Sequence, residues 1–190
     1  MTKRWQRVIG CTALLVAIAT PASADDKSVS PYAATPDSVV SAMLSLASVG
    51  PRDYVIDLGS GDGRLVIAAA KEHGARGLGV DIDAKLVEIA NNLAARDGVT
   101  DRVEFKLQDL FETDLSKATV ITIYLLPSIM GRVADKLRNE LRPGTRVVVH
   151  DFPLPGWRAD RVHAFDVPEK RDYTFNERAT LYLYTVSQRR

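Results

Sequence analysis

The chain has 190 residues, enough for one domain with a substantial core, and its 46% hydrophobic and 26% charged content is ordinary for a globular protein. The formal net charge of +1 argues against a protein that binds nucleic acid through a strong basic field. Residues 25–190 carry 22 basic and 24 acidic groups, a net charge of −2, because Lys3, Arg4 and Arg7 lie in a first segment without acids.

The first 24 residues differ in composition from the rest. The three basic residues precede an apolar run at 8–19, and Ala-Ser-Ala follows at 22–24. A basic start, a short apolar middle and an A-x-A end are typical of a secretory signal peptide. We expect cleavage before Asp25 and export to the periplasm; the alternatives are an uncleaved membrane anchor and a cytoplasmic location. A polar linker is expected at 25–35, followed by one domain at 36–190.

Apolar patterning beyond the linker predicts strands and helices that alternate. Thr35-Pro36 begins a first helix, and Gly50-Pro51 ends it. The next expected elements, in chain order, are a strand at 54–58, a helix at 65–73, a strand at 76–81, a helix at 84–96, strands at 103–107 and 118–124, a helix at 130–141 and a strand at 146–150. Strands at 162–167 and 179–186 follow, with no obvious helix between them. This order predicts an α/β fold with a Rossmann-like, doubly wound sheet of seven strands, mostly parallel, with an antiparallel C-terminal edge strand.

The segment 53–66 carries the most informative pattern. A short apolar strand ends in Asp57, three glycines follow at alternate positions (Gly59, Gly61 and Gly63), and an apolar helix begins at once. Glycines let such a turn approach a ligand closely, and the helix start offers free N–H groups and a positive dipole end. Turns of this kind bind dinucleotides or S-adenosylmethionine.

The spacing separates these two ligands. A dinucleotide site has the pattern GxGxxG, but Arg64 stands at the third glycine position and the pattern here is DxGxGxG. The next strand ends in Asp81, whose carboxylate can accept hydrogen bonds from both hydroxyls of a ribose. The combination favours S-adenosylmethionine; the alternative is a glycine loop that only turns the chain.

This layout resembles the seven-stranded class I methyltransferases over roughly residues 36–190. A closer similarity, to the family of the ATP synthase c-subunit lysine N-methyltransferase and its bacterial relatives, is carried by PYAATP at 31–36, DLGSGDGRLVIAAA at 57–70, GVDID at 79–83, IYLLP at 123–127 and the PGTRVV…DF…W run at 143–157. The resemblance implies S-adenosylmethionine-dependent methylation of a lysine in a protein substrate.

The resemblance also implies a cofactor site. Its expected members are Asp57, Gly59, Gly61, Asp81, Ile82 and Asp109. The glycine backbone would pass beneath the methionine part of the cofactor, with Asp57 near its amino group. Asp81 would hold the ribose, Ile82 would pack on the adenine, and Asp109 would accept from the adenine amino group. The alternatives are a helix N-cap for Asp109 and a plain turn acid for Asp81.

The catalytic side is less defined by sequence. Methyl transfer to an amine depends mainly on positioning, and desolvation favours the neutral, reactive amine. The pocket of an open α/β sheet lies at the carboxyl ends of its strands. This indicates the segment Tyr124-Leu125-Leu126-Pro127 after the fourth strand, with Tyr124, Leu126 and Pro127 as pocket residues, and His150-Asp151 after the fifth strand as further candidates. Tyr32 is a candidate lid. Structural alternatives are a core role for Tyr124, a strand-end role for His150 and a linker role for Tyr32.

Other chemistries lack a pattern in this sequence. The three histidines have no metal-ligand spacing, and no GxSxG elbow is present, so neither a metal site nor a serine hydrolase is predicted. Nucleic acid is not an expected partner, and a membrane is expected only through an uncleaved N-terminal segment. Two alternative functions stay open: methylation of a small molecule or RNA, and a non-catalytic module that binds S-adenosylmethionine.

Overall fold

The computed structural model describes residues 33–172 and 177–187. The predicted signal segment at 1–24, nearly all of the predicted linker at 25–35 and Tyr32 lie outside these residues. Within the described ranges, no helix is both long and apolar enough to cross a membrane.

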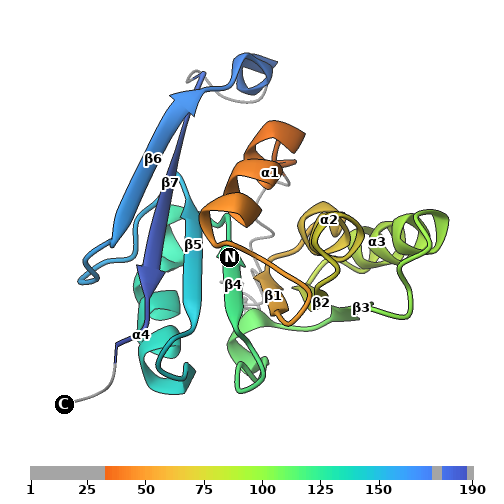
Figure 1. Cartoon of the computed structure of the whole chain (residues 1–190), viewed down its shortest axis with the longest axis horizontal. Helices are drawn as coiled ribbons and strands as arrows, with labels where there is room; N and C mark the ends of the chain where they lie inside the picture. Colours follow the sequence, from red (N-terminus) through yellow and green to blue (C-terminus); the bar gives the residue numbers. More distant parts are fainter. Residues whose placement is uncertain (1–32, 173–176, 188–190) are drawn as a thin grey trace, which may run out of the picture.

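Seven strands form one sheet in the order β3-β2-β1-β4-β5-β7-β6 (Figure 1). The strands are β1 (Tyr54–Leu58), β2 (Arg76–Asp81), β3 (Val103–Leu107), β4 (Val120–Ile123), β5 (Arg146–His150), β6 (Arg161–Asp166) and β7 (Arg178–Thr185). The first five are parallel, whereas β7 runs antiparallel to both β5 and β6. The expected doubly wound sheet is confirmed, and its C-terminal hairpin lies at one edge with β7 inside and β6 outermost.

Helices cover both faces of this sheet. They are α1 (Asp37–Leu46), α2 (Arg64–His73), α3 (Ala84–Arg96) and α4 (Met130–Glu140), with short 3-10 turns η1 (Leu110–Glu112), η2 (Pro127–Ile129) and η3 (Pro168–Asp172). Successive residues of a strand point to opposite faces, so Val55 packs with α1 and α2 while Ile56 packs with α4. Helices α1 to α3 therefore lie on one face and α4 on the other (Figure 1).

Several element bounds differ from the sequence prediction by one to a few residues; the first helix, for example, ends at Leu46, before Gly50-Pro51. The fourth strand spans only Val120–Ile123 rather than 118–124, because Ala118 N–H closes a turn onto the Leu115 carbonyl before the strand begins. The connection between the last two strands contains η3, where the sequence predicts no helix. A 3-10 turn this short gives too little periodicity to be seen in a sequence.

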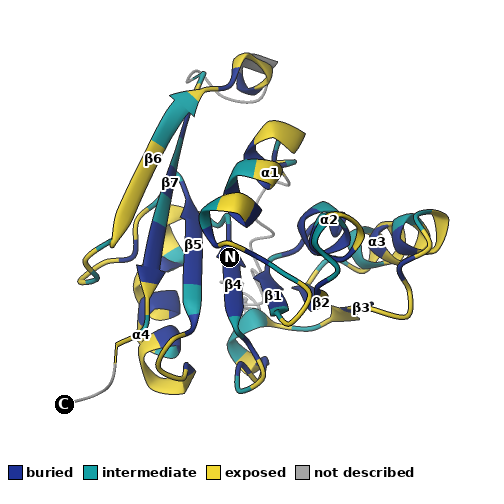
Figure 2. Ribbon diagram, in the orientation of Figure 1, coloured by how far each residue is buried: buried dark blue, intermediate teal, exposed yellow. Residues whose placement is uncertain are grey.

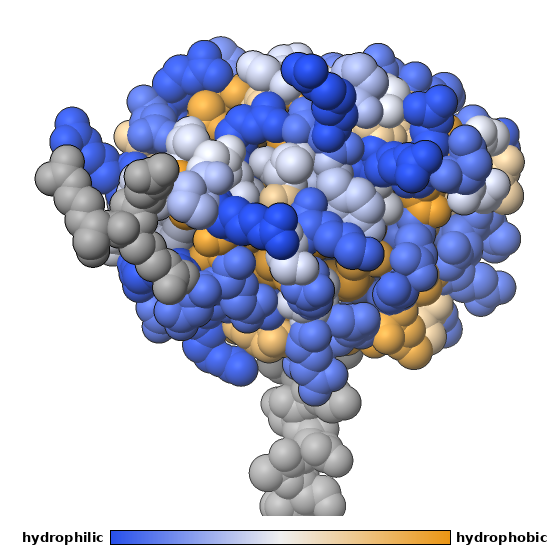
Figure 3. All heavy atoms as spheres, turned by 60° about the horizontal axis from the view of Figure 1, so that its bottom comes forward, coloured by the Kyte–Doolittle hydropathy of each residue, from blue (hydrophilic) through white to orange (hydrophobic). Residues whose placement is uncertain are grey.

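Burial follows the layers. The central strands are buried and the edge strand β6 is mostly exposed (Figure 2). Hydrophilic residues dominate the face drawn in Figure 3, where hydrophobic ones gather only in small patches. Buried polar side chains are the informative exceptions, and they include Asp57, Thr122, His150 and Lys170. All four contribute to the site or to its surroundings.

A partly buried guanidinium joins α1 to the sheet at the amino-terminal end of β5. Arg146 donates to the carbonyls of Ala47 and Ser48 and forms an ion pair with Asp53. The same Asp53 carboxylate accepts a 2.7 Å hydrogen bond from the hydroxyl of Thr119. One side chain thus connects the end of α1 with the starts of β1, β4 and β5.

We expect Arg146→Met to lower the free energy of unfolding by about 2–4 kcal/mol, because it leaves a partly buried carboxylate and two carbonyls without their donor. Denaturant unfolding of the full chain measures the change. Lys106→Met is the matched control: it removes an exposed ion pair with Glu104 (3.1 Å) and should cost less than about 1 kcal/mol. Equal losses in the two variants would contradict this role of Arg146.

Candidate active site

A cavity of about 960 Å³ opens at the carboxyl ends of β1, β2 and β4. One part is lined by the turn after β1 and by the end of β2, including Asp57, Gly61 and Asp81. Another part is lined by Tyr124 and Leu125, which follow β4. This volume lies at the upper end of the range for small-molecule sites, so the cavity has room for a large cofactor and a second reactant.

The turn between β1 and α2 is held against the end of β2. The amides of Gly59 and Ser60 both donate to the carbonyl of Val80, at 3.0 and 2.9 Å. Gly59 and Gly61 have positive φ angles of 80° and 54°, a region that side chains with a Cβ rarely adopt. The alternate glycines are therefore required by the conformation of the turn, as the sequence pattern indicates.

Asp81 joins the two strand ends. One carboxylate oxygen accepts a 2.8 Å hydrogen bond from Gly61 N–H, and the other accepts a 2.9 Å bond from Asp83 N–H. A carboxylate offers about four acceptor sites, so these two bonds leave capacity for further donors from a ligand. Asp81 also lines the cavity, which suits the role that the sequence predicts for it.

Asp57 is buried beneath the same turn, at 5% exposure. It accepts a 2.7 Å hydrogen bond from the hydroxyl of Thr122, which is fully buried on the neighbouring β4. Burial raises the pKa of Asp57 to about 7; the bond from Thr122 opposes the shift, and two neighbouring carboxylates add to it. An ionised Asp57 therefore needs a compensating positive charge.

Ile82, Leu107 and Asp109 line the cavity where β2 and β3 end. Ile82 and Leu107 are exposed apolar side chains there, at 47% and 59%. Asp109 lines the cavity and also caps η1, because its carboxylate accepts a 2.8 Å bond from Phe111 N–H. Asp109 is thus the N-cap that the sequence offers as an alternative, and its place in the cavity leaves the predicted bond to an adenine amino group a prediction.

Comparisons with known proteins identify the family. Residues 57–161, more than half of the chain, match the ANTKMT methyltransferase domain. A protein-lysine N-methyltransferase from Saccharolobus islandicus (strain REY15A) is 39% identical over 159 residues, covering 83% of this chain and 94% of that protein. The chain belongs to the ANTKMT methyltransferase domain family.

Further matches agree with this assignment. The ATP synthase c-subunit lysine N-methyltransferase of Xenopus laevis is 38% identical over 159 residues, covering 82% of this chain and 69% of that protein. An RNA methyltransferase from Salinibacter ruber, solved with S-adenosyl-L-homocysteine, has a TM-score of 0.74 and 46% identity, covering 83% of this chain and 96% of that chain. This member of the family is a class I methyltransferase, and S-adenosylmethionine is its cofactor.

The residues of the cavity fit that cofactor. Asp81 has acceptor capacity for ribose hydroxyls, and Asp57 needs the positive charge that an amino group carries. Ser60 also lines the cavity, although its hydroxyl is buried and has no hydrogen-bond partner among the described residues. Apolar Ile82 and Leu107 offer a surface on which an adenine can pack.

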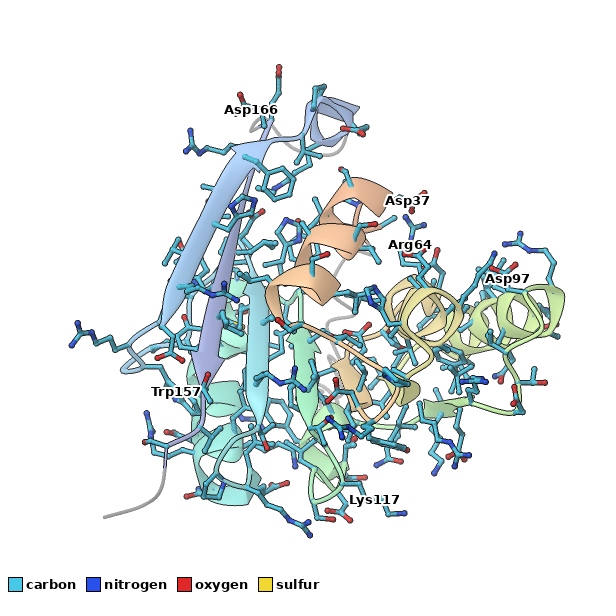
Figure 4. The ribbon with its side chains drawn as sticks, in the orientation of Figure 1. Asp37, Arg64, Asp97, Lys117, Trp157 and Asp166 are labelled. Carbon is cyan, nitrogen blue, oxygen red and sulfur yellow. The ribbon has the colours of Figure 1, made fainter. Side chains whose placement is uncertain are left out.

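Arg64 is a site residue whose role the sequence does not reveal. Its guanidinium bonds both carboxylate oxygens of Asp62, at 2.7–3.1 Å, and donates to the carbonyl of Thr35 at 2.8 Å. It also lies 3.7 Å from Asp37, and Figure 4 shows these two side chains together. Because Thr35 lines the cavity, Arg64 fixes the segment before α1 at the edge of the cofactor region.

Tyr124 separates the cavity from a buried histidine. It lines the cavity, and its ring lies 4.0 Å from that of His150, which is fully buried. The next residue, Leu125, also lines the cavity, whereas Leu126 and Pro127 are not among its lining residues: Leu126 precedes η2 and is 41% exposed, and Pro127 begins η2. The described part of the chain contains no group of three or more possible metal ligands.

We expect cofactor affinity to depend on pH through Asp57. Below pH 7 its carboxyl is protonated in the free protein, and binding of a cationic amino group must then expel that proton. Affinity for S-adenosyl-L-homocysteine, measured by calorimetry, should therefore fall about tenfold for each pH unit below 7. Asp57→Asn should bind weakly and with a flatter pH profile, and an equally steep profile in that variant would contradict this origin.

The same shift predicts the pH dependence of stability without cofactor. The folded pKa of Asp57 is above its unfolded value, so between about pH 4 and 7 the folded protein binds more protons. The contribution of Asp57 to the free energy of unfolding is accordingly largest at low pH and declines as pH rises through this range. Asp57→Asn should remove that decline.

Proposed function

We propose that this enzyme transfers a methyl group from S-adenosylmethionine to the ε-amino group of a lysine in a protein substrate. The observation that best supports this proposal is a single cavity. It is lined both by the carboxylates of the cofactor region and by the side chains of Tyr124, Leu125 and Ile129. Support also comes from the two relatives described above, both named as lysine N-methyltransferases.

The chemistry requires a neutral amine held in line with the transferred group. S-adenosylmethionine, when bound, supplies a methyl group on a positively charged sulfur. A free lysine has a pKa of about 10.4, so nearly all of it is charged at neutral pH. Burial of the amine against the side chains of Leu125 and Ile129 favours its neutral form, and the proton leaves to solvent before the amine attacks.

This chain supplies positioning rather than acid–base groups. The carboxylates of Asp57 and Asp81 would hold the cofactor, and Tyr124 lines the same cavity. Burial and the charge of Asp151 raise the pKa of Tyr124, so its phenol stays protonated and cannot act as a base at neutral pH. Alignment of two reactants can by itself supply about 7–11 kcal/mol of the barrier reduction.

RNA is the second candidate substrate, because the Salinibacter relative is named as an RNA methyltransferase. RNA-binding proteins carry basic stripes that neutralise phosphates. Residues 25–190 have a net charge of −2, from 22 basic and 24 acidic groups. This balance favours the protein substrate.

Labelling of a cell extract tests the substrate class. The protein is incubated with extract and with cofactor that carries a radioactive methyl group. One portion of the product is then digested with protease and another with ribonuclease. We expect the label to become acid-soluble with protease only. Release by ribonuclease, or label confined to small molecules, would overturn the proposal, and no transfer at all would favour the non-catalytic alternative. Asp81→Ala is the negative control.

We further propose that residues 1–24 export the protein, on the strength of their basic start, apolar run and Ala-Ser-Ala end. N-terminal sequencing of the native protein should begin at Asp25, and external protease should reach it once the outer envelope is opened. A full-length chain with accessible domain would indicate an uncleaved anchor instead. A full-length, protease-protected chain in the cytoplasm would overturn the proposal.

A further inference from the structure

Three separate parts of the chain meet behind Tyr124. His150 ends β5 and Asp151 follows it. Lys170 comes from η3, in the connection between β6 and β7 at the top of Figure 1, and Arg178 begins β7. Lys170 is 3% exposed and His150 fully buried. Neither side chain lines the cavity, yet the ring of His150 packs on Tyr124, which does.

The contacts form a continuous chain from η3 to the cavity. The ammonium group of Lys170 donates to the Asp151 carboxylate and, at 3.0 Å, to the carbonyl of Arg178. It also lies 3.5 Å from Nε2 of His150, which is itself 3.5 Å from the Asp151 carboxylate. On its other side, the His150 ring packs against the ring of Tyr124, with 4.0 Å between the ring centroids.

Asp151 holds the backbone in an unusual conformation at this point. Its φ angle is +62°, one of only two positive values among the non-glycine residues that the structure describes. Two hydrogen bonds with Thr180 of β7 fix this conformation. Asp151 N–H donates to the Thr180 carbonyl at 2.7 Å, and Thr180 N–H donates to the Asp151 carboxylate at 3.0 Å. Such strain costs about 1–3 kcal/mol and is frequent at functional sites.

A buried ion pair is weak support for stability, because desolvation of both charges offsets their attraction. The pair of Lys170 and Asp151 does, however, fix a unique arrangement of the groups around it. Burial lowers the pKa of His150; the Asp151 charge opposes this and Lys170 adds to it, so the imidazole is neutral at physiological pH. A neutral, fully packed ring is a firm support for the Tyr124 side chain.

We propose that Lys170 is a positioning residue for methyl transfer: through Asp151 and His150 it holds Tyr124 in the orientation that aligns the acceptor amine. This inference rests on the proposed function and adds η3 to the active site. Misalignment of a reactant by about 1 Å can cost about 100-fold in rate, so a residue that touches neither reactant can still control turnover.

A double-mutant cycle tests this route. In the wild-type background, Lys170→Met should lower kcat for protein methylation about tenfold or more, while affinity for S-adenosyl-L-homocysteine stays within about twofold. In the Tyr124→Ala background, the same change should lower kcat by less than about twofold further, because the group through which Lys170 acts is gone. Lys71→Met, which removes an exposed ion pair with Asp97, is the control and should leave kcat unchanged.

Three results would overturn the inference. Equal losses from Lys170→Met in both backgrounds would show that Lys170 acts independently of Tyr124. The inference would also be overturned if Lys170→Met lost cofactor affinity in parallel with kcat, or if it lost no kcat at all. If Lys170→Met does not fold, the double variant Lys170→Met/Asp151→Asn removes both charges and enters the same cycle. Failure of the proposed function is distinct, since wild-type protein would then produce no methylated lysine.

Discussion

Asp81→Ala is expected to weaken binding of S-adenosyl-L-homocysteine by about 100-fold or more. Two charge-assisted hydrogen bonds to a ribose would be lost, each worth about 1.5–3 kcal/mol. The variant also loses the acceptor for Gly61 N–H and Asp83 N–H, so the glycine turn is no longer fixed to the end of β2. Titration calorimetry on the full chain measures the affinity.

Two further variants show whether the loss comes from the carboxylate itself. Asp81→Asn keeps one acceptor oxygen and should fall between wild type and the alanine variant. Asp101→Ala removes an exposed acid outside the cavity and should bind normally. Wild-type affinity in Asp81→Ala, or tighter binding of a nicotinamide dinucleotide than of S-adenosyl-L-homocysteine by the wild-type protein, would contradict the cofactor site described here.

Gly63→Ala is expected to lower the free energy of unfolding by about 3 kcal/mol or more. Gly63 caps the start of α2 with a φ of +79°, and a Cβ there would lie 2.5 Å from the Phe105 ring and 2.8 Å from Ala90. Backbone strain and overpacking therefore act together. Denaturant unfolding measures the loss, and cofactor affinity should fall with it because α2 follows the glycine turn.

Gly98→Ala isolates the backbone contribution. Gly98 has a similar φ of +70°, but a Cβ at this position meets no atom of the described residues within 4 Å. Its cost should be about 1 kcal/mol, from the left-handed conformation alone. If the two alanine variants lost the same stability, close packing of Gly63 against Phe105 would not be the reason for its requirement.

The parts of the site that the sequence predicts are those that lie close together along the chain. The acid of β1, the alternate glycines and the start of α2 are consecutive, and their order dictates a tight turn at a strand end. Asp81 can be predicted because parallel strands end at the same edge of a sheet. For such residues the local pattern and the fold class together determine the position.

The parts that sequence cannot predict depend on contacts between distant segments. Lys170 reaches Asp151 only because the chain reverses after β6, and nothing in the sequence sets the direction of a 3-10 turn. Arg64 stands out in the sequence only as a mismatch to a dinucleotide pattern, since its contact with Thr35 requires the segment before α1 to cross the start of α2. Likewise, Arg146 and Asp53 are 93 residues apart.

The central claim is lysine methylation, and the chemical identity of the product tests it most directly. Protein labelled with a radioactive methyl group by the wild-type enzyme is hydrolysed to amino acids in acid and separated by chromatography. We predict that the radioactivity elutes with Nε-methylated lysines and disappears with the Asp81→Ala enzyme. Radioactivity in methylated arginine or histidine, or its release as methanol from a carboxyl ester, would contradict the claim.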